Sequence, residues 1–399
     1  MRARCRGAVA LFAAVGLAAL LGSACGPRRP SKDPLDAPPS AADAGTEAVL
    51  PPIHVRASRD GERLTVDAYD ADELFHRATV ALRAGRCDRA IELYRRLEEE
   101  FSGSDLLEPA LYNAGLCHDQ LDQHREAAAS YRALVDRFPG SRDVTDALFR
   151  LAGSLEALEA WDEVIAVLDR LLAERDDLQG VERVEALARK GDALMQIEDV
   201  QGARLALGEA VRLYRRGRGI TPSDPVFHYS MAQFKLGEIV HRKMRAVELP
   251  PDEERLWELL EKKAELLLEA QRLYTKVIRI GHPHWAAAAA YRIGSLYHHL
   301  WVDILTADPP ADLDEEAREI YLDILRERVC VLLEKAVLQW ERTLKLAIRL
   351  GLDNEWIERT TRDLDKIREI LVIEAAGERP QVAPDAAPGG RPEDDADAP

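Results

Sequence analysis

A small residue recurs along this chain at nearly fixed distance, as Ala90, Ala127, Val164 and Ala203. In each case another small residue lies twelve positions upstream and a bulky residue lies four positions downstream. Small residues let two helices approach closely, because a larger side chain would force them apart. The spacing therefore predicts a series of packed antiparallel helix pairs rather than an irregular helical bundle.

The unit around Ala127 shows this pattern most completely. At the spacing of a tetratricopeptide repeat it carries Leu111, Ala114, Gly115, Ala127, Tyr131, Leu134 and Pro139. The chain resembles that family over four units in register, at 71–104, 108–141, 145–178 and 184–217. The resemblance implies an all-α fold in which these four units, together 71–217, stack as a right-handed superhelical solenoid.

Two divergent helix pairs are expected after the regular units. Gly237 precedes a partner helix with Tyr274, and Gly294 precedes one with Trp340, but the connecting segments are longer than a normal turn. Longer helices would absorb this length. A last helix over roughly 355–374 would cover the final unit, because the end of a solenoid has no neighbour. Residues 225–376 are thus predicted to form a divergent helical domain with a capping helix, whose N-cap is Asp353 or Asn354.

The N-terminus has the pattern of an export signal, predicted over 1–24. Three arginines precede an apolar run over 8–21 that is too short to span a bilayer as a helix. The following Leu21-Gly22-Ser23-Ala24-Cys25 resembles the lipobox of bacterial lipoproteins, although Gly22 stands where leucine is usual. The resemblance implies lipidation of Cys25 and, with Gly26 next, sorting to the outer membrane. Ordinary cleavage after Ala24 is the alternative.

The segments that flank the helices have distinct compositions. Residues 25–52 are rich in Pro, Ala, Asp and Ser and are expected to form a disordered tether. Alternating apolar residues surround Asp60-Gly61, which predicts an extended arm or a hairpin over 53–70. Residues 377–399 are predicted to be a disordered acidic tail.

Charge and motifs limit the function classes. The net charge of −17 becomes −20 once Arg2, Arg4 and Arg6 leave with the signal, which argues against a nucleic-acid partner. The sequence shows no phosphate-binding loop, nucleophile elbow or metal-ligand motif, so we expect no enzyme activity, no cofactor and no small-molecule cofactor partner. We expect no metal at the histidines either, because their spacing does not suit one ion: His282, His284, His298 and His299.

Cys87 and Cys117 are predicted to lie side by side where the first two units pack. Cys87 begins the second helix of one unit, and Cys117 lies near the end of the first helix of the next. In an oxidising compartment these two cysteines could form a disulfide. The alternative is that they are two small buried apolar residues.

A helical-repeat solenoid offers a groove lined by the first helix of each pair. Aromatic and polar residues at groove positions suit an extended or helical peptide, and the candidates are Phe75, Thr79, Tyr112, Asn113, Leu116, Gln120, Phe149 and Arg150. Family members that clamp a C-terminal carboxylate have five defined groove residues, of which only Asn113 and Arg150 match here. Asp146 would repel a carboxylate, so that binding mode is not expected.

The chain resembles bacterial tetratricopeptide lipoproteins of the outer-membrane assembly class, and its long C-terminal units are similar to those of gliding-motility proteins. That resemblance implies a non-catalytic scaffold, tethered by lipid to the periplasmic face of the outer membrane and bound to other envelope proteins. The alternative is a periplasmic binder of a glycan or peptide. Most aromatic residues of the C-terminal segment are expected to pack between helices, but a stacking surface for such a ligand could come from Trp285, Tyr291, Tyr297, Trp301 and Trp340.

Overall fold

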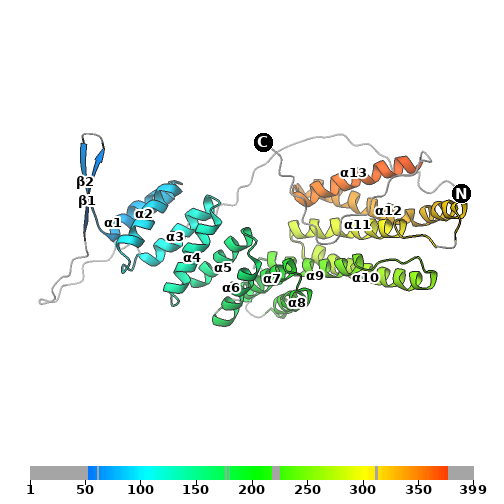
Figure 1. Ribbon diagram of the computed structural model, residues 1–399, viewed down its shortest axis with the longest axis horizontal. Coiled ribbons are helices and arrows are strands. Elements are labelled where there is room, and N and C mark those ends of the chain that lie inside the picture. The colour runs from blue at the N-terminus through cyan, green and yellow to red at the C-terminus, as the bar shows by residue number, and fades with distance from the viewer. Residues whose placement is uncertain are drawn as a thin grey trace.

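The computed structural model confirms the predicted all-α solenoid, in which helix pairs follow one another along the long axis of the molecule (Figure 1). The structure describes residues 53–60, 63–175, 178, 180–217, 225–310 and 313–375. The predicted signal sequence, Cys25, the tether and the acidic tail lie outside this part of the chain. Among the described residues, no helix combines the length and the apolar composition needed to cross a bilayer.

Four helix pairs of similar size form the first half of the stack. Their bounds are α1 Ala71–Arg83 with α2 Cys87–Glu100, α3 Leu107–Gln120 with α4 His124–Arg137, α5 Val144–Ala157 with α6 Trp161–Glu174, and α7 Gly180–Gln196 with α8 Val200–Arg216. The turn inside each pair contains one residue with positive φ: Gly85, Asp122, Glu159 and Glu198. The chain therefore reverses in the same way in all four units, although only the first has the glycine that this conformation favours.

The second half contains longer helices: α9 Phe227–Arg245, α10 Glu253–Ile280, α11 Pro283–Leu305, α12 Glu315–Leu350 and α13 Glu355–Ala375. The side chains of Asp252 and Asp314 accept hydrogen bonds from the first turns of α10 and α12. Asn354, one of the two predicted caps, does the same for α13. Gly281 and Gly351 end α10 and α12 with positive φ, as is common at helix C-termini.

A glycine lies against a large side chain at four of these helix crossings. A methyl group at Gly115 would come within 2.5 Å of Tyr131 Cε1, which is closer than real atoms approach. Gly191 lies against Leu207 in the fourth unit, and the divergent pairs repeat the contact as Gly237 against Tyr274 and Gly294 against Trp340. The same small-to-large contact thus builds both halves of the stack, including the pairs whose connections are longest.

The apolar core is divided between the two halves, and α7 belongs to both. One cluster of buried residues runs from the hairpin and α1 to α7, and the other runs from α7 to α13. The odd-numbered helices also contact one another directly: α1 touches α3, and each helix from α7 touches the next odd-numbered one. Helices that approach each other in this way lie on the inside of a curved stack, so we call the surface of the odd-numbered helices the inner face.

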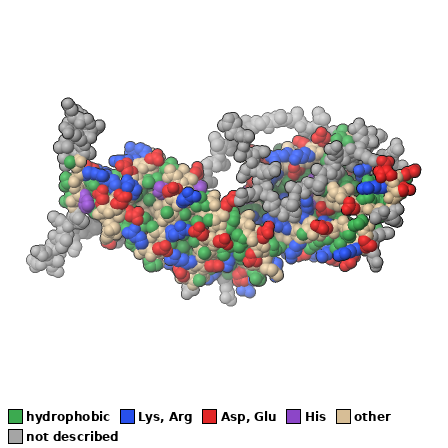
Figure 2. Space-filling view, viewed as in Figure 1, with side chains coloured by type: hydrophobic (Ala, Val, Ile, Leu, Met, Phe, Trp, Pro, Cys, Tyr) green, Lys and Arg blue, Asp and Glu red, His purple; other side chains and the backbone are tan. Residues whose placement is uncertain are grey.

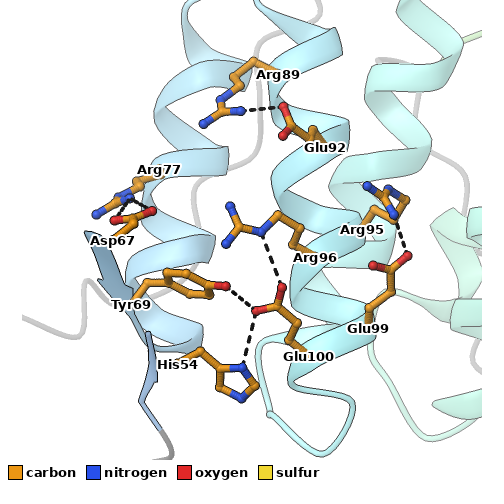
Figure 3. A network of polar contacts seen from close by, with 10 residues as sticks. All are labelled: His54, Asp67, Tyr69, Arg77, Arg89, Glu92, Arg95, Arg96, Glu99 and Glu100. Atoms are coloured by element: carbon orange, nitrogen blue, oxygen red, sulfur yellow. Dashed lines mark hydrogen bonds and ion pairs between the residues drawn. The ribbon is translucent and has the colours of Figure 1, made fainter. Parts of the chain in front are cut away.

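Residues before the solenoid form an antiparallel hairpin, with strands β1 His54–Asp60 and β2 Arg63–Tyr69. Figure 3 shows how it is attached: Tyr69 donates a hydrogen bond to Glu100 at 2.6 Å, and His54 lies 3.6 Å from the same carboxylate. The Arg96 guanidinium stacks over the Tyr69 ring at 4.4 Å. The hairpin is therefore held against the C-terminal end of α2, which offsets the low stability of an isolated hairpin.

Candidate interaction face

The eight residues predicted to line a groove lie on three successive odd-numbered helices. Seven of them are half-buried, and Gln120 is exposed. By helix they are Phe75 and Thr79 on α1; Tyr112, Asn113, Leu116 and Gln120 on α3; and Phe149 and Arg150 on α5. The structure thus gathers all eight on the N-terminal part of the inner face.

Arg150 is tied to its neighbours rather than presented as an isolated cation. Its Nε atom donates to the Tyr112 hydroxyl at 2.8 Å and to Asp146 Oδ2 at 3.0 Å, and Tyr112 itself donates to Asp146. Burial, together with the Asp146 carboxylate, raises the pKa of Tyr112 to about 12, so the phenol remains a donor. Arg150 therefore links α3 to α5, and its charge is balanced before any partner arrives.

Polar contacts of this kind join each odd-numbered helix from α3 onward to the next one. They are Tyr112–Asp146 and Ser154–Asp119 between α3 and α5, Arg189–Glu156 between α5 and α7, Lys235–Asp192 and His228–Glu185 between α7 and α9, Arg292–Glu238 between α9 and α11, and Tyr291–Asp363 between α11 and α13. These contacts cross unit boundaries. They hold the units in register and pair many of the charged side chains on the inner face with one another.

A hollow of about 300 Å³ opens on the inner face where the regular units meet the divergent ones. It is lined by Glu156 at the end of α5, Trp161 at the start of α6, Arg189, Asp192 and Ala193 on α7, and Phe227, His228 and Met231 on α9. None of these eight residues was predicted from the sequence. Their neighbourhood depends on how α9 stacks against α7, and no repeat spacing carries across the irregular connection between the two halves.

The hollow combines aromatic walls with charged ones. Arg189 donates to Glu156 at 2.9 Å and to Glu185 at 3.4 Å, and its side chain is only 12% exposed. Burial and, to a smaller extent, the nearby Arg189 together lower the pKa of His228 to about 4. The imidazole is therefore neutral at pH 7, and the cations here are Arg189 and Lys235.

A second hollow of about 420 Å³ lies between α8, α9 and α10. Leu236, Ile239, Val240 and Leu273 give it an apolar floor, and Arg204, Lys243 and Glu269 stand at its edge. No predicted site residue lines it. On the side of the molecule that Figure 2 shows, acidic and basic side chains are interspersed along the stack rather than separated into patches.

The divergent half buries polar groups inside the helix stack. His241 Nε2 lies 2.8 Å from His299 Nδ1, and Tyr274 donates to Glu238, which also accepts from Arg292 at 2.8 Å. Burial lowers the pKa of His241 to about 3. Burial alone would raise the pKa of Glu238, but Arg292 and His241 outweigh it and lower that pKa. These groups are linked to one another inside the helix stack, and none of them lines either hollow.

The aromatic residues considered for a glycan surface are mostly inside the protein, as expected for rings that pack between helices. Trp285, Tyr291, Trp301 and Trp340 are at most 9% exposed and pack between helices. Trp340 also donates to the backbone carbonyl of Tyr291 at 2.8 Å. Tyr297 is half-buried and donates to Gln271 at 3.3 Å. These rings stabilise the divergent pairs, and they offer no continuous face on which a sugar could stack.

Cys87 and Cys117 lie together, as the predicted packing of the first two units requires. Both are buried, Cys87 at the start of α2 and Cys117 in the last turns of α3. The Cys87 thiol donates to Gln120 Oε1 at 3.0 Å. Burial raises the pKa of Cys117, and its contact with the Cys87 thiol raises it further. The structure contains two thiols rather than a disulfide, so the disulfide stays a prediction.

The histidines that invited a metal interpretation have structural contacts. His284 accepts a hydrogen bond from Trp356 at 3.4 Å, and His299 is paired with His241. The described part of the chain contains no group of three or more His, Cys, Asp or Glu side chains placed to hold a metal ion.

Comparison with known proteins identifies the repeats. Residues 75–142 and 112–179 match the family model described as a tetratricopeptide repeat. Similar solved structures include a tetratricopeptide repeat protein from Parabacteroides merdae, with 15% identity, coverage of 75% of this chain and 98% of that one, and a TM-score of 0.36. MamA from Desulfovibrio magneticus has 16% identity, coverage of 52% and 96%, and a TM-score of 0.35.

The C-terminal part of a repeat protein from Cytophaga hutchinsonii has 11% identity, coverage of 74% and 95%, and a TM-score of 0.40. No match was found among curated proteins. The family match coincides with the units in which the small-residue spacing is most regular. The chain therefore contains tetratricopeptide repeats.

Proposed function

We propose that this protein is a non-catalytic scaffold that binds segments of other envelope proteins on its inner face. Tetratricopeptide repeats generally bind protein partners, and the inner face supplies half-buried aromatic and polar residues of the kind that hold a peptide. The observation that carries the proposal is the hollow at the junction of the two halves. It provides a recess on a face where many polar side chains already pair with one another.

The proposed location is the periplasmic side of the outer membrane, with the chain anchored through a lipid on Cys25. The export signal, the lipobox-like sequence and the tether composition support this location. The working context would be an envelope complex for gliding motility or outer-membrane assembly, which is where lipoproteins of this type act. A glycan-binding role has no comparable support, because four of the five aromatic residues suggested for it are buried.

The binding face can be tested by photocrosslinking in the native cells. A photoreactive phenylalanine analogue would replace Trp161, which lines the hollow, or Leu205, which is 61% exposed on α8 away from the inner face. The proposal predicts protein crosslinks from position 161 and few from position 205. Equal crosslinking from both positions, or crosslinking from position 205 alone, would contradict it.

The anchor is tested separately by membrane fractionation. The wild-type chain should sediment with outer membranes and incorporate labelled fatty acid, because acyl chains hold lipoproteins to the bilayer. Cys25→Ser should abolish the labelling and release the protein into the periplasmic fraction. A Cys25→Ser variant that fractionates like the wild type would rule the lipid anchor out.

A further inference from the structure

The hollow on the inner face has the size of one amino-acid side chain rather than of a folded segment. Its volume of about 300 Å³ is at the low end for ligand pockets. It lies between the last regular units and the first divergent helix, so a segment that follows the inner face would pass over it. A residue of such a segment could insert its side chain here, while the neighbouring residues stay on the surface.

Acidic groups outnumber basic ones around this hollow. Two carboxylates on its wall, Glu156 and Asp192, are paired with Arg189 and Lys235. Glu185, which contacts both Arg189 and His228, is a third carboxylate that shares the same arginine. Glu156, Asp192 and Arg189 line the hollow, and Glu185 and Lys235 lie beside it as their partners. Since the nearby imidazole is neutral at pH 7, these three carboxylates share two cations.

The third carboxylate is poorly compensated. Burial raises the pKa of Glu185, and although Arg189 opposes this shift, the carboxylates of Glu156 and Glu182 add to it. A group in this position gains when a positive charge approaches, because the attraction is strong where water is partly excluded. An apolar or acidic side chain would instead bury the carboxylate further or repel it.

The remaining wall suits the aliphatic part of a long basic side chain. Trp161 and Phe227 are half-buried aromatic residues, and Met231 lies beside them. Lysine and arginine pack their methylene stems against such surfaces while the charged head reaches a polar group. Aromatic faces also attract cations directly.

We infer that the hollow recognises a lysine or arginine side chain of a bound partner segment. The stem lies against Trp161 and Phe227, and the cation approaches the carboxylates on α5 and α7. This inference rests on the proposed function, because it specifies the chemistry of the segment that the inner face binds. Selectivity comes from charge complementarity, so binding weakens as the ionic strength rises.

The inference is tested with a displayed library of random twelve-residue peptides, selected on the full-length chain in detergent. Selected peptides should share a lysine or arginine, and replacing that residue with norleucine or citrulline should weaken binding at least tenfold. Glu185→Gln should reduce this discrimination. The control is Glu163→Gln, because Glu163 is 59% exposed on α6 and pairs with Arg132 away from the hollow.

The outcomes separate this inference from the proposed function. If selected peptides bind the inner face but contain no common basic residue, or tolerate norleucine without loss, the basic side-chain preference is wrong and the scaffold proposal survives. If no peptide is selected at all, the scaffold proposal fails together with the inference. Circular dichroism of Glu185→Gln would show whether the variant keeps its helices, and Asp192→Asn supplies a second carboxylate variant for the same measurement.

Discussion

Tyr131 in the second unit and Tyr274 in the first divergent pair occupy equivalent positions, yet their hydroxyl groups serve different parts of the molecule. Each ring covers a glycine of the preceding helix. The Tyr131 hydroxyl reaches the half-buried Asp119 on the inner face at 2.8 Å, whereas the Tyr274 hydroxyl is buried with Glu238 and His241. The same glycine–tyrosine contact therefore places the partners of the hydroxyl group near the surface in the regular repeats and inside the protein in the divergent half.

This difference follows from helix length. The regular units have helices of 13 to 17 residues, whereas α10 and α12 have 28 and 36. The longer helices cover their neighbours over more turns, so side chains that would be exposed in a short unit become enclosed. Lys263 shows this directly: its side chain is 2% exposed and its Nζ atom lies 2.5 Å from Asp303. Removing the counter-charge of Lys263 in the divergent half should therefore cost more stability than removing that of the more exposed Arg150 in the regular half.

The largest expected effect comes from breaking the buried pair. Asp303→Asn leaves the Lys263 ammonium enclosed without a counter-charge, which costs about 3–5 kcal/mol of unfolding free energy. The matched change in the regular half, Asp146→Asn, removes a partner of the more exposed Arg150 and should cost less than about 1 kcal/mol. Urea unfolding followed by circular dichroism measures both.

A double variant provides the control for that experiment. Lys263→Met with Asp303→Leu replaces both charges by apolar groups and should recover most of the lost stability, since a buried pair is often no better than a packed apolar contact. Equal losses for Asp303→Asn and Asp146→Asn would contradict the proposed difference between the two halves.

The disulfide predicted between Cys87 and Cys117 would stabilise only the regular half. It would close a loop of about 30 residues and add about 3–4 kcal/mol to the unfolding free energy, according to the chain-entropy model. Protein isolated from its native cells without reductant should lose this increment on reduction, while Cys117→Ser should show no change on reduction. Alkylation of all three cysteines in unfolded, unreduced protein that lacks Cys25 would show that no bridge forms.

Alanine at the glycine contacts should destabilise both halves by overpacking. Gly294→Ala would place a methyl group 2.1 Å from Trp340 Nε1, and Gly115→Ala would place one 2.5 Å from Tyr131 Cε1. Each should cost about 1–3 kcal/mol, with the larger loss at Gly294 because Trp340 is 1% exposed and hydrogen-bonded in the core. Gly140→Ala has no atom within 4 Å and should change stability by less than about 0.5 kcal/mol. Similar losses at all three positions would refute the close-approach argument.

Acid should weaken the divergent half over a defined range. His241, which faces Glu238, Tyr274, Arg292, Arg245 and His299, has its pKa lowered from the ordinary value near 6.5 to about 3. As the pH falls, His241 is therefore protonated in the unfolded chain near pH 6.5 but in the folded chain only near pH 3. The unfolding free energy is constant with respect to this group above pH 6.5 and decreases between pH 6.5 and pH 3. One histidine changes the unfolding free energy by at most about 1.4 kcal/mol per pH unit.

Unfolding followed by tryptophan fluorescence reports this loss, because five of the six tryptophans lie in the divergent half and only Trp161 lies in the regular units. His241→Asn should reduce the slope between pH 6.5 and pH 4. An unchanged slope in that variant would show that His241 does not contribute.

The sequence predicted the helix pairs because their spacing reflects a local packing rule. A glycine opposite a large residue is recognisable even across the long connections, as with Gly294 and Trp340. The pairing of Arg150 with Tyr112 and the burial of Lys263 were not predicted, because each depends on a side chain from another unit. The hollow was missed for the same reason: Trp161, Arg189 and Phe227 come together only when α9 stacks on α7.

Hydrogen exchange of the full-length chain, measured with and without a peptide selected by it, tests most directly whether a partner binds on the inner face at the junction of the two halves. If a partner binds there, exchange should slow around the hollow, at the C-terminal ends of α5 and α7 and the start of α9, with α8 and α10 unchanged. Slower exchange confined to α8, α10 or the hairpin would contradict the proposed inner-face binding, because the partner would then bind elsewhere than on the odd-numbered helices.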